Sequence, residues 1–292
     1  MPLLTTTRPR AAAAVAAAAL LALALAAPTQ SAPPKRVVAL TPFTANVLAG
    51  VGFKPVAIGQ TLGGNDRFSS KLNGVPRLAL SHPNGPNLEK LATYNPQLVL
   101  SGPAWRKGQK GMKGLGMSVS ESDPRSVKAA VTDAQRIAKL VGRGPQGAAL
   151  AKRMQASIRS SKKGIKKRPS VLLVLGVGQT TFAFLDNSWG GDVVKNAGGK
   201  LITSGLRSSG GYARISDETV LARNPDIIIA VPHGEPDQLG KLATYLKNKP
   251  GWRKTKAAKN DRVYISTGNS LLQAFPDVGR TIKDVRKKFL HN

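Results

Sequence analysis

The sequence predicts an α/β protein of two lobes with parallel central sheets, joined by one long helix. Three observations lead to this prediction. In each half of the chain, short runs of apolar residues alternate with helical stretches. Between the halves, residues 123–167 carry no strand pattern. A segment of the first half also recurs in the second half, 129 residues further on. Continuous apolar strands that alternate with helices are typical of parallel sheets covered on both faces.

The predicted strands are short and rich in β-branched residues. In the first half a helix over residues 43–48 is expected after the first strand, and it ends at Gly50 and Gly52. Runs of this length, bounded by glycine or proline, are read as buried strands. The strands are expected at 37–40, 55–58, 98–100 and 117–119 in the first half, and at 171–175, 227–230 and 263–265 in the second.

The middle of the chain is predicted to be helical. Asp123 is a suitable N-cap, Pro124 suits a first helical turn, and Gly142 ends this helix. A second helix opens at Pro145, with apolar side chains at helical spacing and basic residues between them. We therefore expect an N-terminal lobe over residues 33–143, an inter-lobe helix over 144–168 and a C-terminal lobe over 169–292.

Residues 1–32 are predicted to be a secretory signal peptide. Arg8 and Arg10 give a positive start, and residues 11–27 form an uncharged apolar run that ends in small residues. A membrane anchor is the alternative, but this run is short for a span of roughly 20 residues. Cleavage is expected among Ala26, Ala27 and Ala32. The protein is thus expected to be exported, and to be soluble in the periplasm or cell envelope.

Charge and cysteine content narrow the possible classes. The full chain has 44 Lys and Arg against 15 Asp and Glu, a net charge of +29. Removal of the two signal-peptide arginines leaves +27. Export argues against nucleic acid as the partner, so an anionic envelope, an anionic ligand or an adaptation to the medium are the interpretations left open. Because the sequence has no cysteine, disulfides, thiolate metal sites and a lipid-modified cysteine are excluded.

An internal repeat links the two halves. Residues 87–100 align with residues 216–229, and each copy reads as a short helix, an Asn-Pro stop and a buried strand. Glu89 aligns with Glu218, and each follows a residue suited to be an N-cap. Proline cannot continue a helix and restrains the residue before it.

Several segments together resemble a known family. They are Arg36–Pro42, Asn87–Val99, Gly190–Gly199, Tyr212–Asp226 and Lys259–Tyr264, and their order and spacing are specific. The chain resembles the periplasmic solute-binding proteins of ABC importers that capture iron complexes or cobalamin. The resemblance implies a ligand cleft between the lobes, a monomer, and delivery of a small-molecule chelate to a permease dimer with its ATPase subunits. It also implies that Glu89 and Glu218 pair with arginines of the permease.

Candidate ligand contacts follow from the rule that ligands bind beyond the carboxyl ends of parallel strands. His82 and His233 are also candidate ligands for a haem iron, because imidazole is a common axial ligand. The simpler interpretation is that both are surface histidines. Aromatic rings suit porphyrins and corrins, and arginines suit carboxylates. The predicted ligand-binding residues are Phe43, Thr61, His82, Trp105, Arg106, Tyr212, Arg214 and His233.

Enzymatic motifs are incomplete. Gly176 and Gly178 would need a glycine at 181 for a dinucleotide-binding motif, and Thr181 stands there. We therefore predict a binding protein that is not an enzyme, needs no catalytic cofactor and captures a ferric siderophore or haem. Cobalamin is an alternative ligand, and a basic protein that binds envelope polyanions without transport is an alternative function. The sequence does not choose among the ligands.

Overall fold

The computed structural model describes residues 1, 32–60, 67–207, 210–235 and 237–291. Contacts divide the chain into two units, Met1–Pro33 and Pro34–Asn292. The predicted signal peptide therefore lies almost entirely outside the described residues. Among the helices that are described, none has the length and apolar character required to cross a membrane. The fold described below is that of the second unit.

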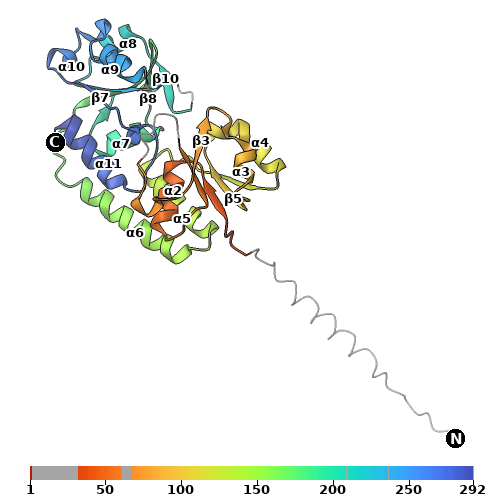
Figure 1. Ribbon diagram of the computed structural model, residues 1–292. Helices are drawn as coiled ribbons and strands as arrows, with labels where there is room; N and C mark the ends of the chain where they lie inside the picture. Colours follow the sequence, from red (N-terminus) through yellow and green to blue (C-terminus); the bar gives the residue numbers. More distant parts are fainter. Residues whose placement is uncertain (2–31, 61–66, 208–209, 236, 292) are drawn as a thin grey trace. The chain divides into compact units, whose positions relative to one another are not determined.

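The first sheet contains six strands in the order β4-β3-β2-β1-β5-β6 (Figure 1). All neighbouring pairs are parallel except β3 and β4. The four strands predicted in this half are present, and β3 and β4 were not predicted. The strands are β1 (Val37–Ala39), β2 (Ala57–Gln60), β3 (Arg77–Ser81), β4 (Gly85–Pro86), β5 (Leu98–Ser101) and β6 (Ser118–Glu121).

The second sheet has the order β10-β8-β7-β11-β12, with β9 pairing to β7. Its centre is parallel, as predicted, but β8 is antiparallel to both β7 and β10. The reason is that β7 continues through Val177 and turns back at Gly178, whose φ is 56°. The strands are β7 (Ser170–Val177), β8 (Thr180–Phe184), β9 (Lys200–Leu201), β10 (Tyr212–Arg214), β11 (Ile227–Pro232) and β12 (Val263–Ile265). The α/β class with two largely parallel sheets is confirmed.

Helices cover the sheets, and side-chain caps fix where several of them begin. Ser126, not Asp123, caps α5, because its side chain accepts a hydrogen bond from the Ala129 amide. Thr41 caps α2 directly after β1. The helices are α2 (Pro42–Gly50), α3 (Leu88–Ala92), α4 (Arg106–Gly114), α5 (Val127–Leu140), α6 (Gly144–Ser161), α7 (Trp189–Asn196), α8 (Asp217–Arg223), α9 (Leu239–Lys247), α10 (Lys256–Lys259) and α11 (Val278–Val285).

The long helix α6 ends at Ser161, seven residues earlier than the predicted 168. The Arg286 guanidinium, in the last turn of the chain, donates hydrogen bonds to the carbonyls of Ser161, Lys163 and Gly164. These bonds satisfy groups that the end of a helix leaves without partners. Gly164 has a φ of 73°, a value that does not continue a right-handed helix. Residues 162–169 therefore connect α6 to β7 without helical structure.

One large apolar core extends through both lobes. It includes Val37 of β1 and Leu100 of β5 from the first sheet, and Val171 of β7 and Ile229 of β11 from the second. Buried residues of α2, α5, α6, α7 and α11 belong to the same cluster. The opposite face of each sheet has its own smaller core. The lobes are thus held together by a shared layer of helices in addition to the single connection through α6 (Figure 1).

Candidate functional site

The internal repeat is visible in the structure. Asn87 caps α3 and Ser216 caps α8, each by accepting a hydrogen bond from the backbone amide three residues ahead. Glu89 and Glu218 lie in the first turns of these helices and are exposed. The hydrogen bond from the Ser216 side chain lowers the pKa of Glu218 below its ordinary value. Both N-caps were predicted from the sequence.

Each copy of the repeat also contains a left-handed asparagine and a side-chain hydrogen bond to the first strand of its lobe, and neither was predicted from the sequence. Asn95 and Asn224 both adopt left-handed backbone conformations, with φ of 43° and 44°. Two residues later, the Gln97 side chain accepts hydrogen bonds from the amides of Lys35 and Arg36, just before β1. At the equivalent position, the Asp226 carboxylate accepts hydrogen bonds from the amide and the hydroxyl of Ser170, at the start of β7. The two lobes therefore fix their first strands in the same way.

At the carboxyl edge of the first sheet, the ends of β1, β5 and β6 come together. Gly102 follows β5, and a Cβ atom on it would lie 3.0 Å from Cγ2 of Thr41 and 3.7 Å from the Ser122 carbonyl oxygen. Only glycine allows this approach without a shift. Trp105 follows shortly after, but only 8% of its surface is exposed, because it packs into the core of that lobe. Its ring meets His82 edge-on at 6.2 Å.

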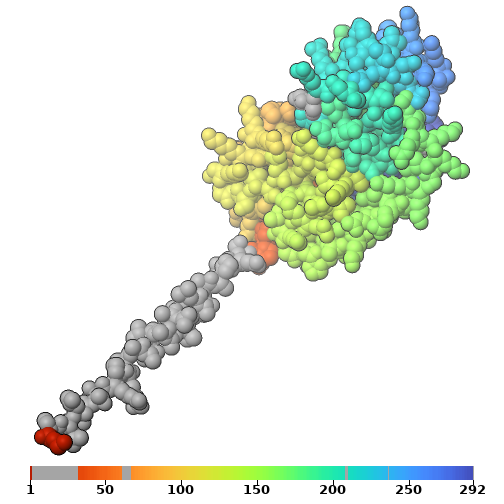
Figure 2. Space-filling view, turned by 180° about the vertical axis from the view of Figure 1, so that it is seen from behind, coloured from red at the N-terminus to blue at the C-terminus, as the bar shows by residue number. Residues whose placement is uncertain are grey.

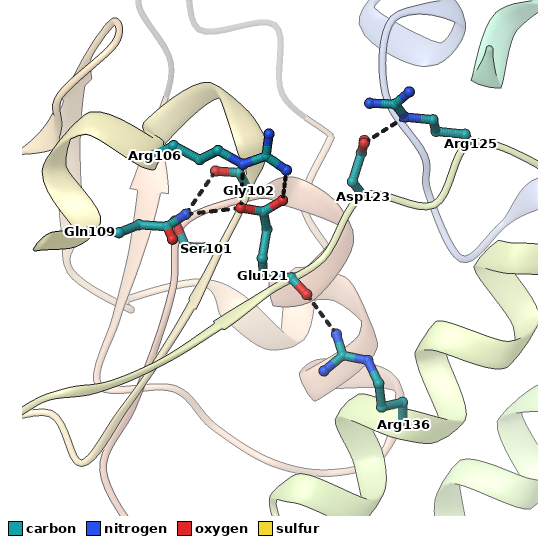
Figure 3. A network of polar contacts seen from close by, with 8 residues as sticks. All are labelled: Ser101, Gly102, Arg106, Gln109, Glu121, Asp123, Arg125 and Arg136. Atoms are coloured by element: carbon teal, nitrogen blue, oxygen red, sulfur yellow. Dashed lines mark hydrogen bonds and ion pairs between the residues drawn. The ribbon is translucent and has the colours of Figure 1, made fainter. Parts of the chain in front are cut away.

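Arg106 does not present a free cation to a ligand. Its Nε donates to Oε2 of Glu121 at 2.8 Å, and its Nη2 bonds to the other carboxylate oxygen (Figure 3). The pairing lowers the pKa of Glu121. Gln109 donates a further hydrogen bond to Oε2 of Glu121 at 3.3 Å. The expected ligand contact at Arg106 is therefore occupied by an acidic side chain of the same lobe.

A second arginine anchors the same strand to α5. Arg136 donates to the Glu121 carbonyl at 2.9 Å, to the Ser120 hydroxyl at 2.7 Å and to Oδ1 of Asp133 at 2.6 Å. The Glu121 contact is drawn in Figure 3. Because these three bonds start from one planar guanidinium, they fix the direction in which the chain leaves β6. Asp123 and Arg125, which follow, pair with each other at 2.7 Å.

His82 lies in the turn between β3 and β4 and is exposed. This turn rests on α4, because a Cβ atom on Gly108 would lie 1.8 Å from the Asn84 carbonyl oxygen. His233 follows β11 in the other lobe and is also exposed. Its backbone amide donates to the Gly176 carbonyl at 2.8 Å, which extends the pairing of β11 with β7 by one residue.

The His82 imidazole influences the protonation of His233 across the two lobes. Desolvation lowers the pKa of His233, and the His82 imidazole lowers it further. The two causes favour the neutral imidazole, the form that can coordinate a metal. Among the residues described, no group of three or more His, Asp and Glu side chains could hold a metal ion by itself. Two of the predicted site residues, one from each lobe, thus interact electrostatically.

Tyr212 and Arg214 lie on β10, at the edge of the second sheet. Tyr212 is half-buried, with its ring 4.9 Å from that of Phe184. Burial raises the pKa of Tyr212, and the Asp123 carboxylate raises it further. Arg214 is exposed, and since residues two apart on a strand share a face, it lies on the same side as Tyr212. Tyr212 of one lobe is thus near Asp123 of the other.

Two predicted contacts do not form part of an exposed site. Phe43 is only 3% exposed, because its ring packs into the large core from the first turn of α2. Thr61 lies outside the described residues. Sequence reasoning also missed Asp123 and Arg125 as neighbours of Tyr212. The signal was present, because both follow the carboxyl end of β6, but Asp123 was interpreted as a helix cap.

The molecule thus consists of two α/β lobes, and His82 and His233 each follow the end of a strand in one of them. Residues 37–269 match the family described as "Periplasmic binding protein". Over 204 residues, which make up 67% of each sequence, the chain is 30% identical to the high-affinity heme uptake system protein IsdE of Staphylococcus aureus strain Newman. The chain therefore belongs to the periplasmic binding protein family. Members of this family are transporter binding proteins and not enzymes.

Solved structures agree with this assignment. S. aureus IsdE complexed with heme superposes with a TM-score of 0.72 at 25% identity, covering 87% of this chain and 98% of IsdE. An ABC transporter substrate-binding protein of Listeria monocytogenes EGD-e gives a TM-score of 0.77 at 24% identity, over 90% of this chain and 100% of that one. The periplasmic vitamin B12 binding protein BtuF of Vibrio cholerae gives 0.68 at 18% identity, over 89% and 98%. The last two likenesses concern the fold alone.

Proposed function

We propose that this protein is the extracytoplasmic solute-binding component of an ABC importer, and that it captures an iron complex between its lobes. The proposal is supported by membership of the periplasmic binding protein family, and by His82 and His233, which lie in different lobes and interact electrostatically. A ligand held by both lobes is presented to the permease by both. Within this class we favour haem, since its iron accepts imidazole nitrogens at its axial positions.

The environment of His233 supports iron coordination. Its lowered pKa keeps the ring neutral at physiological pH, so a lone pair is available. On the same lobe, Tyr212 provides a partly exposed aromatic face, and Arg214 provides a cation without an ion-pair partner among the described residues. An aromatic face suits the porphyrin plane, and a guanidinium suits a propionate group. The family relation to a heme uptake protein points in the same direction.

A haem titration tests the proposal. We expect the purified protein to give a saturable Soret band, and His233→Ala to shift the band and weaken binding at least tenfold. His82→Ala should also alter the spectrum if both rings ligate. His291→Ala is the matched control, because that histidine bonds to Tyr264 near the C-terminus. Spectra that are identical for the wild type and His233→Ala would remove His233 from the site. Absence of haem binding would leave ferric siderophores or cobalamin as the ligand.

We further propose that Glu89 and Glu218 dock the two lobes onto the permease. Both are exposed, both begin equivalent helices, and the chain has only 15 acidic residues in all. Isolated carboxylates on a basic surface are specific partners for arginines of another protein. A favourable interaction with the helix dipole is the simpler explanation of their positions.

Charge reversal separates these explanations. The Glu89→Arg, Glu218→Arg double variant should bind ligand normally but fail to support uptake in cells. A control variant with Asp186→Arg and Asp284→Arg carries the same change in charge at other exposed positions. We expect the control to transport normally. Full transport by the Glu double variant would reject the docking role, and loss of ligand affinity would instead assign the glutamates to the site or the fold.

We also propose that the protein is exported with cleavage of residues up to Ala26, Ala27 or Ala32. Mass spectrometry of the protein recovered outside the cytoplasm tests this. A mature N-terminus at Ala27, Pro28 or Pro33 is expected. Recovery of the intact chain, with Met1 present, would show that no signal peptide is removed.

A further inference from the structure

One long segment of the chain carries basic residues and no acidic ones. From Ala134 to Leu185 there are eleven Lys and Arg and no Asp or Glu. This segment comprises the end of α5, all of α6, the connection 162–169 and strands β7 and β8. β7 and β8 carry none of these cations, and most of the exposed ones lie on α6 and in the connection.

We call six exposed cations on the end of α6, in the connection and on β9 the basic strip. α6 packs its apolar face on α5 and α11 and leaves its basic side chains outside. Figure 2 shows this green part of the chain on the outer surface, between the yellow N-terminal lobe and the cyan C-terminal lobe. The connection then leads to β9 across a hollow of about 710 Å³. The strip consists of Arg159, Lys162, Lys163, Lys166, Arg168 and Lys200, all exposed.

These cations are not neutralised within the molecule. Among the described residues, no acidic side chain forms an ion pair with any of the six. The hollow contains two carboxylates, but both are engaged. Asp186 pairs with Lys195 at 3.3 Å, and Asp192 accepts hydrogen bonds from Asn196 and from the Val127 amide. An external anion is therefore the natural partner of the strip.

We propose that the basic strip is a peripheral docking surface for an anionic phospholipid bilayer. A cluster of four to eight lysines and arginines is what anionic headgroups attract, at about 1 kcal/mol for each residue near the surface. Most of the strip is lysine, whose compact, mobile charge suits a diffuse field of headgroups better than a fixed bidentate site. No aromatic residue occurs from Ala134 to Thr181. Base stacking on single-stranded nucleic acid needs such rings, so nucleic acid is the weaker alternative.

The position of the strip gives the proposal a consequence. The strip adjoins Ser170, at the amino end of β7, and His233 bonds to Gly176 near its carboxyl end. At about 3.3 Å for each residue, the two sites are about 20 Å apart. α8 precedes β11, so Glu218 also lies at the carboxyl edge. A molecule adsorbed through the strip therefore turns its ligand site and Glu218 away from the bilayer, and it must release the strip before the proposed docking onto a membrane permease.

Vesicle sedimentation tests the proposal. The protein should bind phosphatidylcholine vesicles that contain about one third phosphatidylglycerol. It should dissociate from them at high salt, and it should not bind vesicles of pure phosphatidylcholine. The strip variant changes Lys162, Lys163, Lys166 and Arg168 to Gln. It should bind the anionic vesicles about tenfold or more weakly than the wild type does. A control changes Lys54, Lys71, Lys113 and Lys241 to Gln, four exposed cations elsewhere with the same total charge. The control should bind nearly as the wild type does.

Three outcomes would overturn the proposal. Equal loss of binding in both variants would show that net charge alone is responsible. Failure of the wild type to bind the anionic vesicles would exclude a bilayer as the partner. Tighter binding to single-stranded RNA than to the vesicles, lost only in the strip variant, would assign the strip to nucleic acid. Circular dichroism and haem absorbance of the variants establish that fold and ligand site are intact.

Discussion

At the scale of single residues, the His233 imidazole has two neighbours that set its protonation. Surrounding protein removes part of its hydration, and His82 approaches from the other lobe. Both effects disfavour the charged ring. The second effect is the more informative, because it exists only if the two lobes are arranged as described. It can be measured without any ligand.

We expect the pKa of His233 to be below its ordinary value of about 6.5 and to move back up in the His82→Ala variant. Removal of the His82 imidazole removes one cause of the depression and leaves the desolvation. Titration of the His233 ring protons by NMR measures the change. His291→Ala, at the distant C-terminus, should leave the His233 titration where it is. The same pKa in wild type and His82→Ala would mean that the two rings are not neighbours.

The same shift predicts how stability depends on pH. Between the lowered folded pKa and about 6.5, the unfolded chain binds more protons at His233 than the folded chain does. Stability therefore rises with pH through this window, and the contribution is lost as the pH falls below about 6.5. The His233→Gln variant should show a flatter dependence of the urea midpoint on pH over this range. An unchanged dependence would contradict the shift.

At the scale of elements, the repeated unit of helix, left-handed asparagine, proline and strand is the most instructive. The left-handed conformation costs an L-residue roughly 1–2 kcal/mol. The cost is smallest for glycine, which has no side chain, and it is reduced for asparagine. The two asparagines differ in one respect. The Asn224 side chain accepts a hydrogen bond from the Lys256 amide at 2.8 Å, which helps to hold α10.

Substitution separates these two contributions. Asn95→Ala should lower the free energy of unfolding by about 1 kcal/mol, whereas Asn95→Gly should be nearly neutral. Asn224→Gly should cost about 1 kcal/mol, because the hydrogen bond to Lys256 is lost. Urea denaturation of the three variants measures the differences. If Asn95→Gly proved as destabilising as Asn95→Ala, backbone conformation would not be the reason for asparagine there.

Elements also show which features the sequence makes predictable. Strands apolar throughout, such as β5 and β11, were found because both of their faces are buried. β3 was missed because it lies next to the edge and alternates buried and exposed residues. In the site, His233 follows from the strand-end rule, whereas His82 was singled out as one of only three histidines, since the strand before it was not predicted. Phe43 and Arg106 satisfy the same rule, yet one packs inward and the other pairs with Glu121, and only three-dimensional contacts decide this.

At the scale of the whole molecule, the shared core limits how the lobes can move. Residues of both sheets and five helices belong to one apolar cluster. A hinge rotation would have to separate packed side chains, which costs buried apolar area. Binding proteins with flexible hinges close by large rotations. We therefore predict only small adjustments of the lobes on ligand binding.

Small-angle scattering tests this rigidity. We expect the radius of gyration of the mature protein to be the same, within error, with and without saturating ligand. A protein of the hinge-closing kind measured alongside it provides the positive control. A clear compaction on ligand binding would show that the shared core does not prevent closure.

The central claim is that this member of the periplasmic binding protein family carries an iron complex. The most direct test is an absorbance screen of the purified mature protein against haem, ferric siderophores and cobalamin, with equal concentrations and competition between them. We predict saturable one-to-one binding of an iron complex, with haem preferred, and no displacement by cobalamin. Tight binding of cobalamin alone, or binding of none of the three, would contradict the account.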